Sequence, residues 1–245
     1  MIVGFAGSGS MAAAMARGWV GEFEGMLFSD SGSGRARALA EELGGEAVPN
    51  AEIAARADLV VLAVKPAKLA EAAASLAGAK VVISLLGATP LEQVAAAFPG
   101  AEVHRVMPNV AVEVRRGVLC LAGPDSPAVR EKLGVLGHVV ELPDEEFDAA
   151  TAVMGCAPAY LALAVEAIAA AGAADGLDPD LARELVVETT AGTAELLRRH
   201  HPADVRKAVA SPGGSTEAGL EALDRAGGRE AFEAAVRASL ERMRG

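Results

Sequence analysis

The chain has 245 residues, 52% of them hydrophobic, and its 33 acidic and 22 basic residues give a formal net charge of -11. This composition excludes an intrinsically disordered chain, and the acidic balance argues against nucleic-acid binding, which needs a basic surface for the phosphates. The two cysteines suit a reducing cytoplasm. We expect no signal peptide, because the N-terminus has no basic region. We expect no membrane-spanning helix, because no uninterrupted run of about 18 apolar residues occurs.

Short apolar runs alternate with helical patterns in the N-terminal part of the chain. The run Leu59–Val64 is continuous and rich in β-branched residues, which is typical of a strand buried on both faces of a parallel sheet. Strands are predicted at Ile2–Ala6, Met26–Ser29, Leu59–Val64, Lys80–Leu85, Val103–Met107, Val118–Leu121 and His138–Leu142. Helices are predicted between them at Met11–Val20, Arg35–Leu43, Ala67–Leu76, Pro90–Phe98 and Pro127–Leu136. This alternation predicts a doubly wound α/β sheet.

The pattern changes near Pro143 and Asp144, beyond which no strand is predicted. Asp178 followed by Pro179 is a helix cap with proline at the first helical position. Helices are predicted at Glu145–Ala174, Pro179–Arg199, Ala203–Val209 and Arg229–Arg242. We therefore predict two domains, a sheet domain over residues 1–145 and an all-helical domain over residues 146–245.

A glycine-rich turn lies between the first strand and the first helix, with the spacing Gly7-x-Gly9-x-x-Ala12. In a Rossmann dinucleotide site the first glycine permits the tight turn, the second lets the backbone approach a pyrophosphate, and a small third residue lets helix pack on strand. The helix N-terminus supplies N–H groups for the phosphates. Because this turn opens a βαβ series, it predicts a dinucleotide site, although a glycine turn without a ligand is the alternative.

The end of the second strand should contact the ribose of the dinucleotide. Asp30 lies 21 residues after Gly9, close to the spacing of an acidic residue that binds the ribose of NAD. The neighbouring Ser29, Ser31, Ser33 and Arg35 could instead hold the 2′-phosphate of NADP, or all of them could belong to a solvated loop. The sequence leaves the choice between NADPH and NADH open.

Three further segments occur in a characteristic order and spacing. They are Val64-Lys65-Pro66, Arg105-Val106-Met107-Pro108-Asn109 and Ser211-Pro212-Gly213-Gly214-Ser215-Thr216-Glu217-Ala218-Gly219-Leu220. With the glycine turn, they resemble the pyrroline-5-carboxylate reductase family over essentially the whole chain, and the third segment is the most specific of them.

The resemblance implies an N-terminal Rossmann-type domain followed by an all-helical dimerisation domain. It implies an NAD(P)H-dependent reductase of proline biosynthesis that converts the cyclic imine 1-pyrroline-5-carboxylate to L-proline, with NADPH as cofactor and NADH as the other option. It also implies a cytoplasmic homodimer that can assemble into a larger ring of dimers.

By motif matching, the resemblance assigns residues to two sites. The cofactor residues are Gly7, Gly9, Ser10, Met11, Ser29, Asn50, Val64, Lys65, Pro66, Pro108 and Asn109. The substrate residues are Ser211, Gly214, Ser215 and Thr216. Thr216 is the proposed catalytic residue, because its hydroxyl could face the ring nitrogen, whereas a helix cap is its alternative role.

The sequence departs from the family pattern at four places. Ser10 stands for a usual Asn, Leu86 for Ala, Val110 for Thr, and Cys156-Ala157 for Ser-Gly. Two alternatives therefore stay open: a reductase of another cyclic imine or related small acid, and a non-catalytic dinucleotide-binding regulatory homologue.

Imine reduction needs no protein nucleophile, because the cofactor carries the hydride and the protein supplies orientation and electrostatics. The four histidines lack the spacing of metal ligands, so no metal site is expected. We expect His104 to be structural, Tyr160 to pack with its hydroxyl satisfied, and Cys156 to be an inert small side chain.

Overall fold

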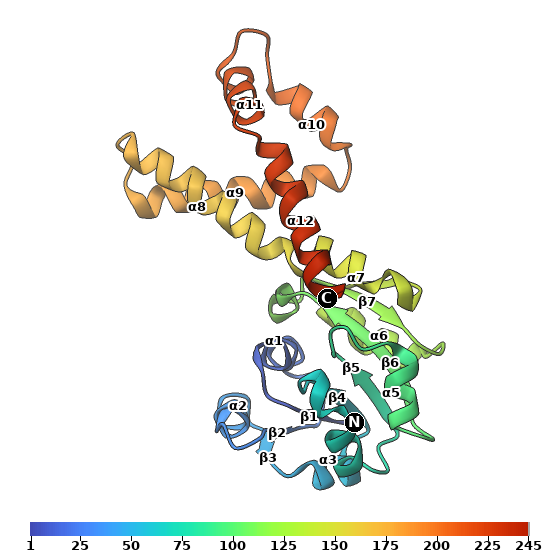
Figure 1. The fold of residues 1–245 in the computed structure, drawn as a ribbon. Helices are drawn as coiled ribbons and strands as arrows, with labels where there is room; N and C mark the ends of the chain where they lie inside the picture. Colours follow the sequence, from blue (N-terminus) through green and yellow to red (C-terminus); the bar gives the residue numbers. More distant parts are fainter. Residues whose placement is uncertain (245) are drawn as a thin grey trace. The chain divides into compact units, whose positions relative to one another are not determined.

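The structure is a computed structural model that describes residues 1–244. The chain forms two compact units, one of Met1–Cys156 together with residues 240–244, and one of Ala157–Ser239 (Figure 1). The first unit thus extends beyond residue 145, and the predicted domain boundary at residues 145 and 146 stays a prediction.

The described part of the first unit contains one eight-stranded sheet in the order β3-β2-β1-β4-β5-β6-β7-β8. Neighbouring strands are parallel except for β6 and β7, which are antiparallel. The strands are β1 (Ile2–Ala6), β2 (Gly25–Ser29), β3 (Glu46–Ala47), β4 (Leu59–Leu62), β5 (Val81–Ser84), β6 (Glu102–Pro108), β7 (Gly117–Ala122) and β8 (Gly137–Glu141). Because β1 lies between β2 and β4, the strand order reverses there, and ligands of doubly wound sheets bind at such switch points.

Helices connect these strands. They are α1 (Ser10–Gly18), α2 (Arg35–Leu43), α3 (Asn50–Arg56), α4 (Leu69–Ser75), α5 (Leu91–Ala97) and α6 (Pro127–Leu136). Short 3₁₀ turns are η1 (Pro66–Lys68), η2 (Val110–Val114) and η3 (Asp144–Glu146). After η3 the unit ends with α7 (Phe147–Ala150) and the π-helical turn η4 (Thr151–Gly155).

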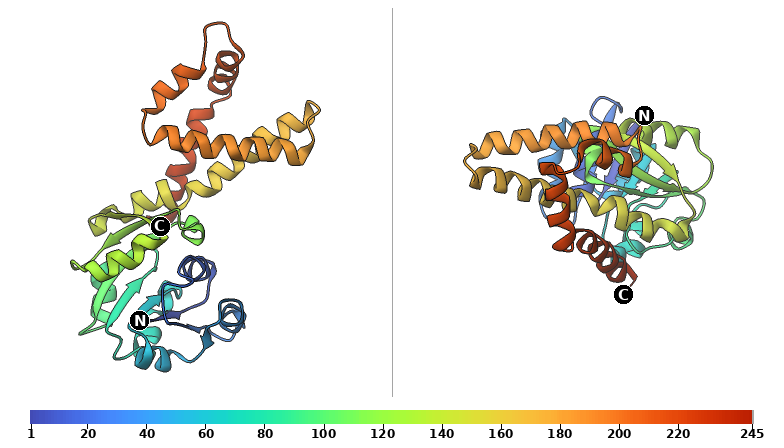
Figure 2. Two further views of the ribbon diagram at one scale, coloured as in Figure 1. Left: turned by 180° about the vertical axis from the view of Figure 1, so that it is seen from behind. Right: turned by 90° about the horizontal axis from the view of Figure 1, so that it is seen from above.

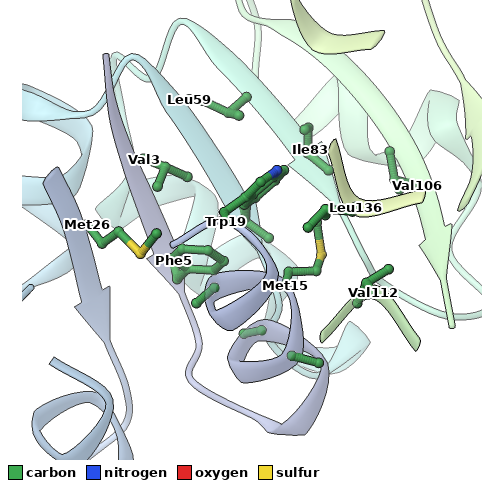
Figure 3. Close-up of a cluster of buried hydrophobic side chains, with 14 of the residues drawn as sticks. Val3, Phe5, Met15, Trp19, Met26, Leu59, Ile83, Val106, Val112 and Leu136 are labelled. Atoms are coloured by element: carbon green, nitrogen blue, oxygen red, sulfur yellow. The ribbon is translucent and has the colours of Figure 1, made fainter. Parts of the chain in front are cut away.

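The sheet has an apolar core on each face, which confirms the predicted doubly wound architecture. Val61 of β4 belongs to one core, whereas its neighbours Val60 and Leu62 belong to the other. The first core surrounds Trp19, which is completely buried and donates from its indole nitrogen to the Lys132 carbonyl oxygen at 2.8 Å (Figure 3).

The second unit is helical, as predicted. Its helices are α8 (Ala157–Ala174), α9 (Pro179–Leu197), α10 (Pro202–Val209), α11 (Ser215–Arg225) and most of α12 (Gly228–Arg244). Helices α8 and α9 lie side by side in both views of Figure 2. The Asp178 side chain caps α9 by accepting from the amides of Asp180 and Leu181, as predicted.

Helix α8 exposes large apolar side chains. Leu161, Leu163 and Ile168 are 56%, 65% and 60% exposed. The helical segment Asp144–Ala174 has the length and apolar composition of a helix that could cross a membrane. The expectation of no such helix rested on uninterrupted apolar runs, which this segment lacks even though its average composition is apolar.

Two predictions of secondary structure were incomplete. The predicted helix over residues 145–174 is interrupted, because the π turn η4 separates α7 from α8. Strand β3 and helix α3 were not predicted. Both residues of β3 are exposed, so they give no apolar alternation that sequence reasoning can detect.

Candidate functional site

Gly7 joins the ends of three strands at the switch point. It has φ +100°, and a Cβ atom at this position would lie 2.5 Å from the carbonyl oxygen of Ala63, just after β4. The Gly7 amide donates to the Ser29 carbonyl oxygen at 3.1 Å, and the Ser8 hydroxyl donates to the same oxygen at 2.9 Å. Because the turn lies directly against β2 and β4, only glycine fits at this position.

Gly9 plays a different part, because its surroundings are open. It is the N-cap of α1 with φ -78°, no side chain caps the helix, and a Cβ atom on Gly9 would meet nothing within 4 Å. Amide groups at such an uncapped helix start favour an anion. A cavity of about 370 Å³ lies at this turn, lined in part by Ser8, Gly9, Ser10 and Arg35.

These features fit a dinucleotide diphosphate. The turn is anchored on one side by Gly7, and its other side presents uncapped amides and an open glycine to a cavity. Among the predicted residues, Gly9 and Ser10 line that cavity directly, whereas Met11 is a partly buried residue of α1.

The Asp30 carboxylate is engaged within its own loop. Its Oδ1 accepts from the amides of Gly32 and Ser33 at 2.7 and 3.1 Å, and its Oδ2 accepts from the Ala36 amide and the Ser33 hydroxyl at 2.8 and 2.9 Å. The Ala36 amide contributes most to a lowered Asp30 pKa, so the carboxylate stays ionised. Four internal donors occupy the acceptor sites of a carboxylate for which the sequence spacing had left ribose binding open.

Arg35 lies beside the same loop. Its Nε donates to the Ser33 hydroxyl at 3.0 Å, and its side chain lines the cavity at the glycine turn. Besides Nε, the guanidinium has further N–H donors that suit an anion.

Two predicted cofactor residues from different elements contact one another. The Ser29 hydroxyl at the end of β2 donates to the Asn50 side-chain oxygen at the start of α3. The Asn50 nitrogen donates to the Ser75 hydroxyl at 2.8 Å. Ser8 and Ser75 were missed by sequence reasoning, because nothing in their local pattern identifies their partners.

The remaining predicted cofactor residues follow β4 and β6. Val64 is half-buried, whereas Lys65 and Pro66 are exposed, and Pro66 begins η1. Pro108 and Asn109 are buried at the end of β6. Because β1, β4, β5 and β6 run parallel, the segments that follow them lie along one edge of the sheet.

The predicted substrate loop lies in the second unit. Gly213 has φ +73°, and its amide donates to the Glu217 carboxylate at 2.7 Å, while the Gly214 amide donates to the Ser211 carbonyl oxygen at 2.9 Å. Gly214 is the N-cap of α11, and no side chain caps this helix. The first turn of α11 thus presents amides that suit a carboxylate.

Thr216 is the second residue of α11 and is half-buried. Its alternative role as a helix cap is wrong, because Gly214 occupies the cap position and no side chain caps α11.

The structure agrees with two sequence interpretations outside these sites, those of His104 and Tyr160, whereas the inertness of Cys156 stays a prediction. His104 is completely buried in β6, where its Nε2 lies 2.8 Å from Glu102 Oε1. The Tyr160 hydroxyl contacts the Ser239 hydroxyl and donates to the Ala235 carbonyl oxygen. Cys120 and Cys156 are free.

Family models match both parts of the chain. The model for pyrroline-5-carboxylate reductase dimerisation matches residues 144–245, and the model described as NADP oxidoreductase coenzyme F420-dependent matches residues 2–87. The first match includes the whole second unit, and the second includes the glycine turn and the Lys65 segment.

Two relatives and one solved structure carry the same enzyme name. A pyrroline-5-carboxylate reductase from Synechocystis sp. is 39% identical over 204 residues, which cover 79% of this chain and 76% of the relative. One from Thermus thermophilus is 36% identical, covering 85% of this chain and 82% of the relative. The crystal structure of 1-pyrroline-5-carboxylate reductase from Streptococcus pyogenes is 28% identical, with a TM-score of 0.90 over 99% of this chain and 98% of that one. The chain therefore belongs to the pyrroline-5-carboxylate reductase family.

Proposed function

We propose that the protein reduces 1-pyrroline-5-carboxylate to L-proline with a hydride from NAD(P)H. The observation that carries this proposal is the open, uncapped glycine turn at the sheet's switch point, in a chain that belongs to the family and retains the Ser211–Leu220 segment. When bound, the nicotinamide cofactor supplies the hydride.

In this proposal the first unit binds the dinucleotide. The amides of Ser10 and Met11 at the start of α1 bind the diphosphate, and the open backbone of Gly9 allows close approach. Ser29 and Asn50 form a hydrogen-bonded pair on the adenosine side. The segments at Lys65 and Pro108 border the remaining length of the cofactor.

The second unit binds the substrate. The uncapped start of α11 at Ser215 and Thr216 holds the substrate carboxylate, and the Ser211 hydroxyl adds a donor. The Thr216 hydroxyl hydrogen-bonds the ring nitrogen, which is protonated as the imine and becomes an amine after hydride arrives. Thr216 therefore orients the ring and stabilises its nitrogen, while no side chain needs to act as a nucleophile.

We propose NADPH as the preferred cofactor. Asp30 would repel a 2′-phosphate if it faced the ligand, but its oxygens accept four hydrogen bonds from its own loop. Arg35 provides a cation at the same cavity. NADH is the alternative, and comparing kcat/KM for the two cofactors distinguishes them.

We also propose a cytoplasmic homodimer built through the second unit. The exposed Leu161, Leu163 and Ile168 form more apolar surface than an isolated surface helix needs, and the dimerisation model matches this region. A second copy, rather than lipid, is the occupant that we infer for this surface. A ring of such dimers is a further assembly that the family resemblance implies.

The test is oxidation of NADPH and of NADH by the purified protein with pyrroline-5-carboxylate at neutral pH, with proline formation measured directly. We expect turnover with both cofactors and a higher kcat/KM with NADPH. Folded protein that binds NADPH but produces no proline would overturn the proposal in favour of a regulatory homologue.

A further inference from the structure

Strand β6 holds the segment through which the chain leaves the first unit. Arg105 is 4% exposed, and its Nη1 donates to Asp144 Oδ1 at 2.9 Å. Its guanidinium carbon lies 4.6 Å from the centre of the Phe147 ring. Asp144 Oδ2 also accepts from the Leu91 amide at 3.0 Å, so the beginning of this segment is fixed to β6 and α5.

Asn109, immediately after β6, holds the other end of the same segment. Its Oδ1 accepts from the Val118 amide at 3.1 Å, and its Nδ2 donates to the Met154 carbonyl oxygen at 3.2 Å. The side chain is almost completely buried. Because an amide N–H can only donate and a carbonyl can only accept, these two partners define the orientation of the Asn109 amide group.

The Met154 carbonyl lacks its α-helical donor for a reason that lies in the sequence. In the α-helical register, the N–H of residue 158 would donate to the carbonyl of residue 154. Residue 158 is proline and has no N–H. Met154 also lies in the π turn η4, where the Cys156 amide donates to the Thr151 carbonyl oxygen at 3.1 Å, five residues back.

We propose that Asn109 is a positioning residue whose side chain replaces the hydrogen bond that Pro158 cannot make. In this way it fixes the π turn that precedes α8. This gives the predicted cofactor residue a more specific role, since its amide group acts on Met154 and not on the nicotinamide.

The consequence for turnover rests on the proposed function. The π turn that Asn109 contacts leads in sequence into the unit that carries the substrate loop, and Asn109 itself adjoins the proposed cofactor residue Pro108. Loss of the Asn109 side chain should therefore lower kcat while leaving NADPH affinity unchanged, because small misplacements of reacting groups cost rate.

A double-mutant cycle on thermal stability tests the structural part without any activity. Asn109→Ala should lower the Tm. Pro158→Ala restores an N–H at position 158, so it should raise the Tm in the Asn109→Ala background more than in the unaltered protein. The recovery should be partial, because the Val118 amide stays unpaired. Strictly additive effects of the two substitutions would overturn the proposal.

Asn109→Asp provides a second variant, also useful if Asn109→Ala does not fold. It keeps an acceptor for Val118 and replaces the donor to Met154 with a carboxylate oxygen that cannot donate when ionised and that repels the carbonyl oxygen. Pro158→Ala should therefore stabilise it more than it stabilises the unaltered protein. Equal effects of Pro158→Ala in both backgrounds would count against the Met154 contact.

The kinetic arm compares NADPH dissociation constants with kcat for the same variants. We expect an unchanged Kd, a kcat lower on the order of tenfold, and recovery of kcat on adding Pro158→Ala. A weaker Kd for NADPH that Pro158→Ala does not restore would show that the side chain binds the cofactor. If the unaltered protein itself lacks turnover, the proposed function fails, while the stability cycle still decides the role of Asn109.

Discussion

Gly7 lies so close to Ala63 that a Cβ atom on Gly7 would be 2.5 Å from the Ala63 carbonyl oxygen, whereas a Cβ atom on Gly9, two residues later, would meet nothing within 4 Å. The two glycines of one turn therefore serve different purposes, although the sequence pattern Gly7-x-Gly9 shows only that both positions are glycine. Gly7 closes the turn against the sheet, and Gly9 leaves space for a ligand.

This contrast predicts opposite results for two alanine substitutions. Gly7→Ala places a methyl group against backbone at φ +100° and should destabilise the fold by more than about 1 kcal/mol. Gly9→Ala should leave the Tm unchanged but weaken NADPH binding by about tenfold or more, or ~1.4 kcal/mol, because its methyl group would enter the diphosphate site. Denaturant unfolding and NADPH titration check both. Normal NADPH affinity in Gly9→Ala would contradict the proposed site.

The role of Thr216 is tested by removing its hydroxyl and then restoring it. Thr216→Ala loses a bond to a charged nitrogen, worth about 1.5–3 kcal/mol, so kcat/KM for the imine should fall roughly tenfold to a hundredfold. Thr216→Ser keeps the hydroxyl and should retain most activity. NADPH affinity should not change in either variant. Unchanged steady-state kinetics in Thr216→Ala would remove this residue from the reaction.

Cofactor selectivity should depend on Arg35. Arg35→Ala removes the cation beside the cavity, so the Kd for NADPH should rise while the Kd for NADH stays nearly constant. Arg35→Lys keeps the charge and serves as the matched control. A parallel weakening of both cofactors would show that Arg35 only shapes the loop.

The Asp30 loop should make folding stability sensitive to acid. Hydrogen bonds, chiefly from the Ala36 amide, lower the folded-state pKa of Asp30 below the ordinary value of an aspartate. A lowered folded pKa means that this stabilisation is present above the unfolded-state pKa and is lost as the pH falls through the folded-state pKa. Asp30→Asn should therefore reduce stability at neutral pH and flatten its fall in acid. Urea unfolding across this pH range measures both effects, and parallel curves for the two proteins would refute the prediction.

The dimer proposal predicts a sharp effect of charge on α8. Leu163 is 65% exposed in the single chain, and Leu163→Asp should yield a monomer at micromolar concentration because the charge would be buried against the second copy. Val20→Asp, at a 49% exposed position in the first unit, is the control and should remain a dimer. Light scattering distinguishes them. A monomeric unaltered protein would contradict the inferred occupant of this surface.

Sequence patterns predicted most of the fold because local signals mark its elements. Helices α2 and α6 have the predicted bounds, since glycine in a left-handed conformation ends the first and proline begins the second. The break at η4 has no comparable local signal. Pro158 was visible in the sequence, but the donor that compensates for it comes from Asn109, which lies 45 residues before its acceptor Met154.

The candidate site shows the same limit. The glycine turn and the Ser211 segment were recognisable because their function depends on backbone conformation that glycine encodes locally. The engagement of Asp30 depends on four precise loop contacts, and the pairing of Ser29 with Asn50 depends on how α3 packs beside β2. Such distant or geometric relationships require coordinates.

The chain has one tryptophan and one tyrosine, and each belongs to a different unit. Trp19 is completely buried in the first unit, and Tyr160 makes its hydroxyl contacts within the second. Indole fluorescence therefore follows the unfolding of the first unit alone, whereas helical circular dichroism includes the second unit. Without any label, a loss of cooperativity between the halves would be seen as two transitions that no longer coincide.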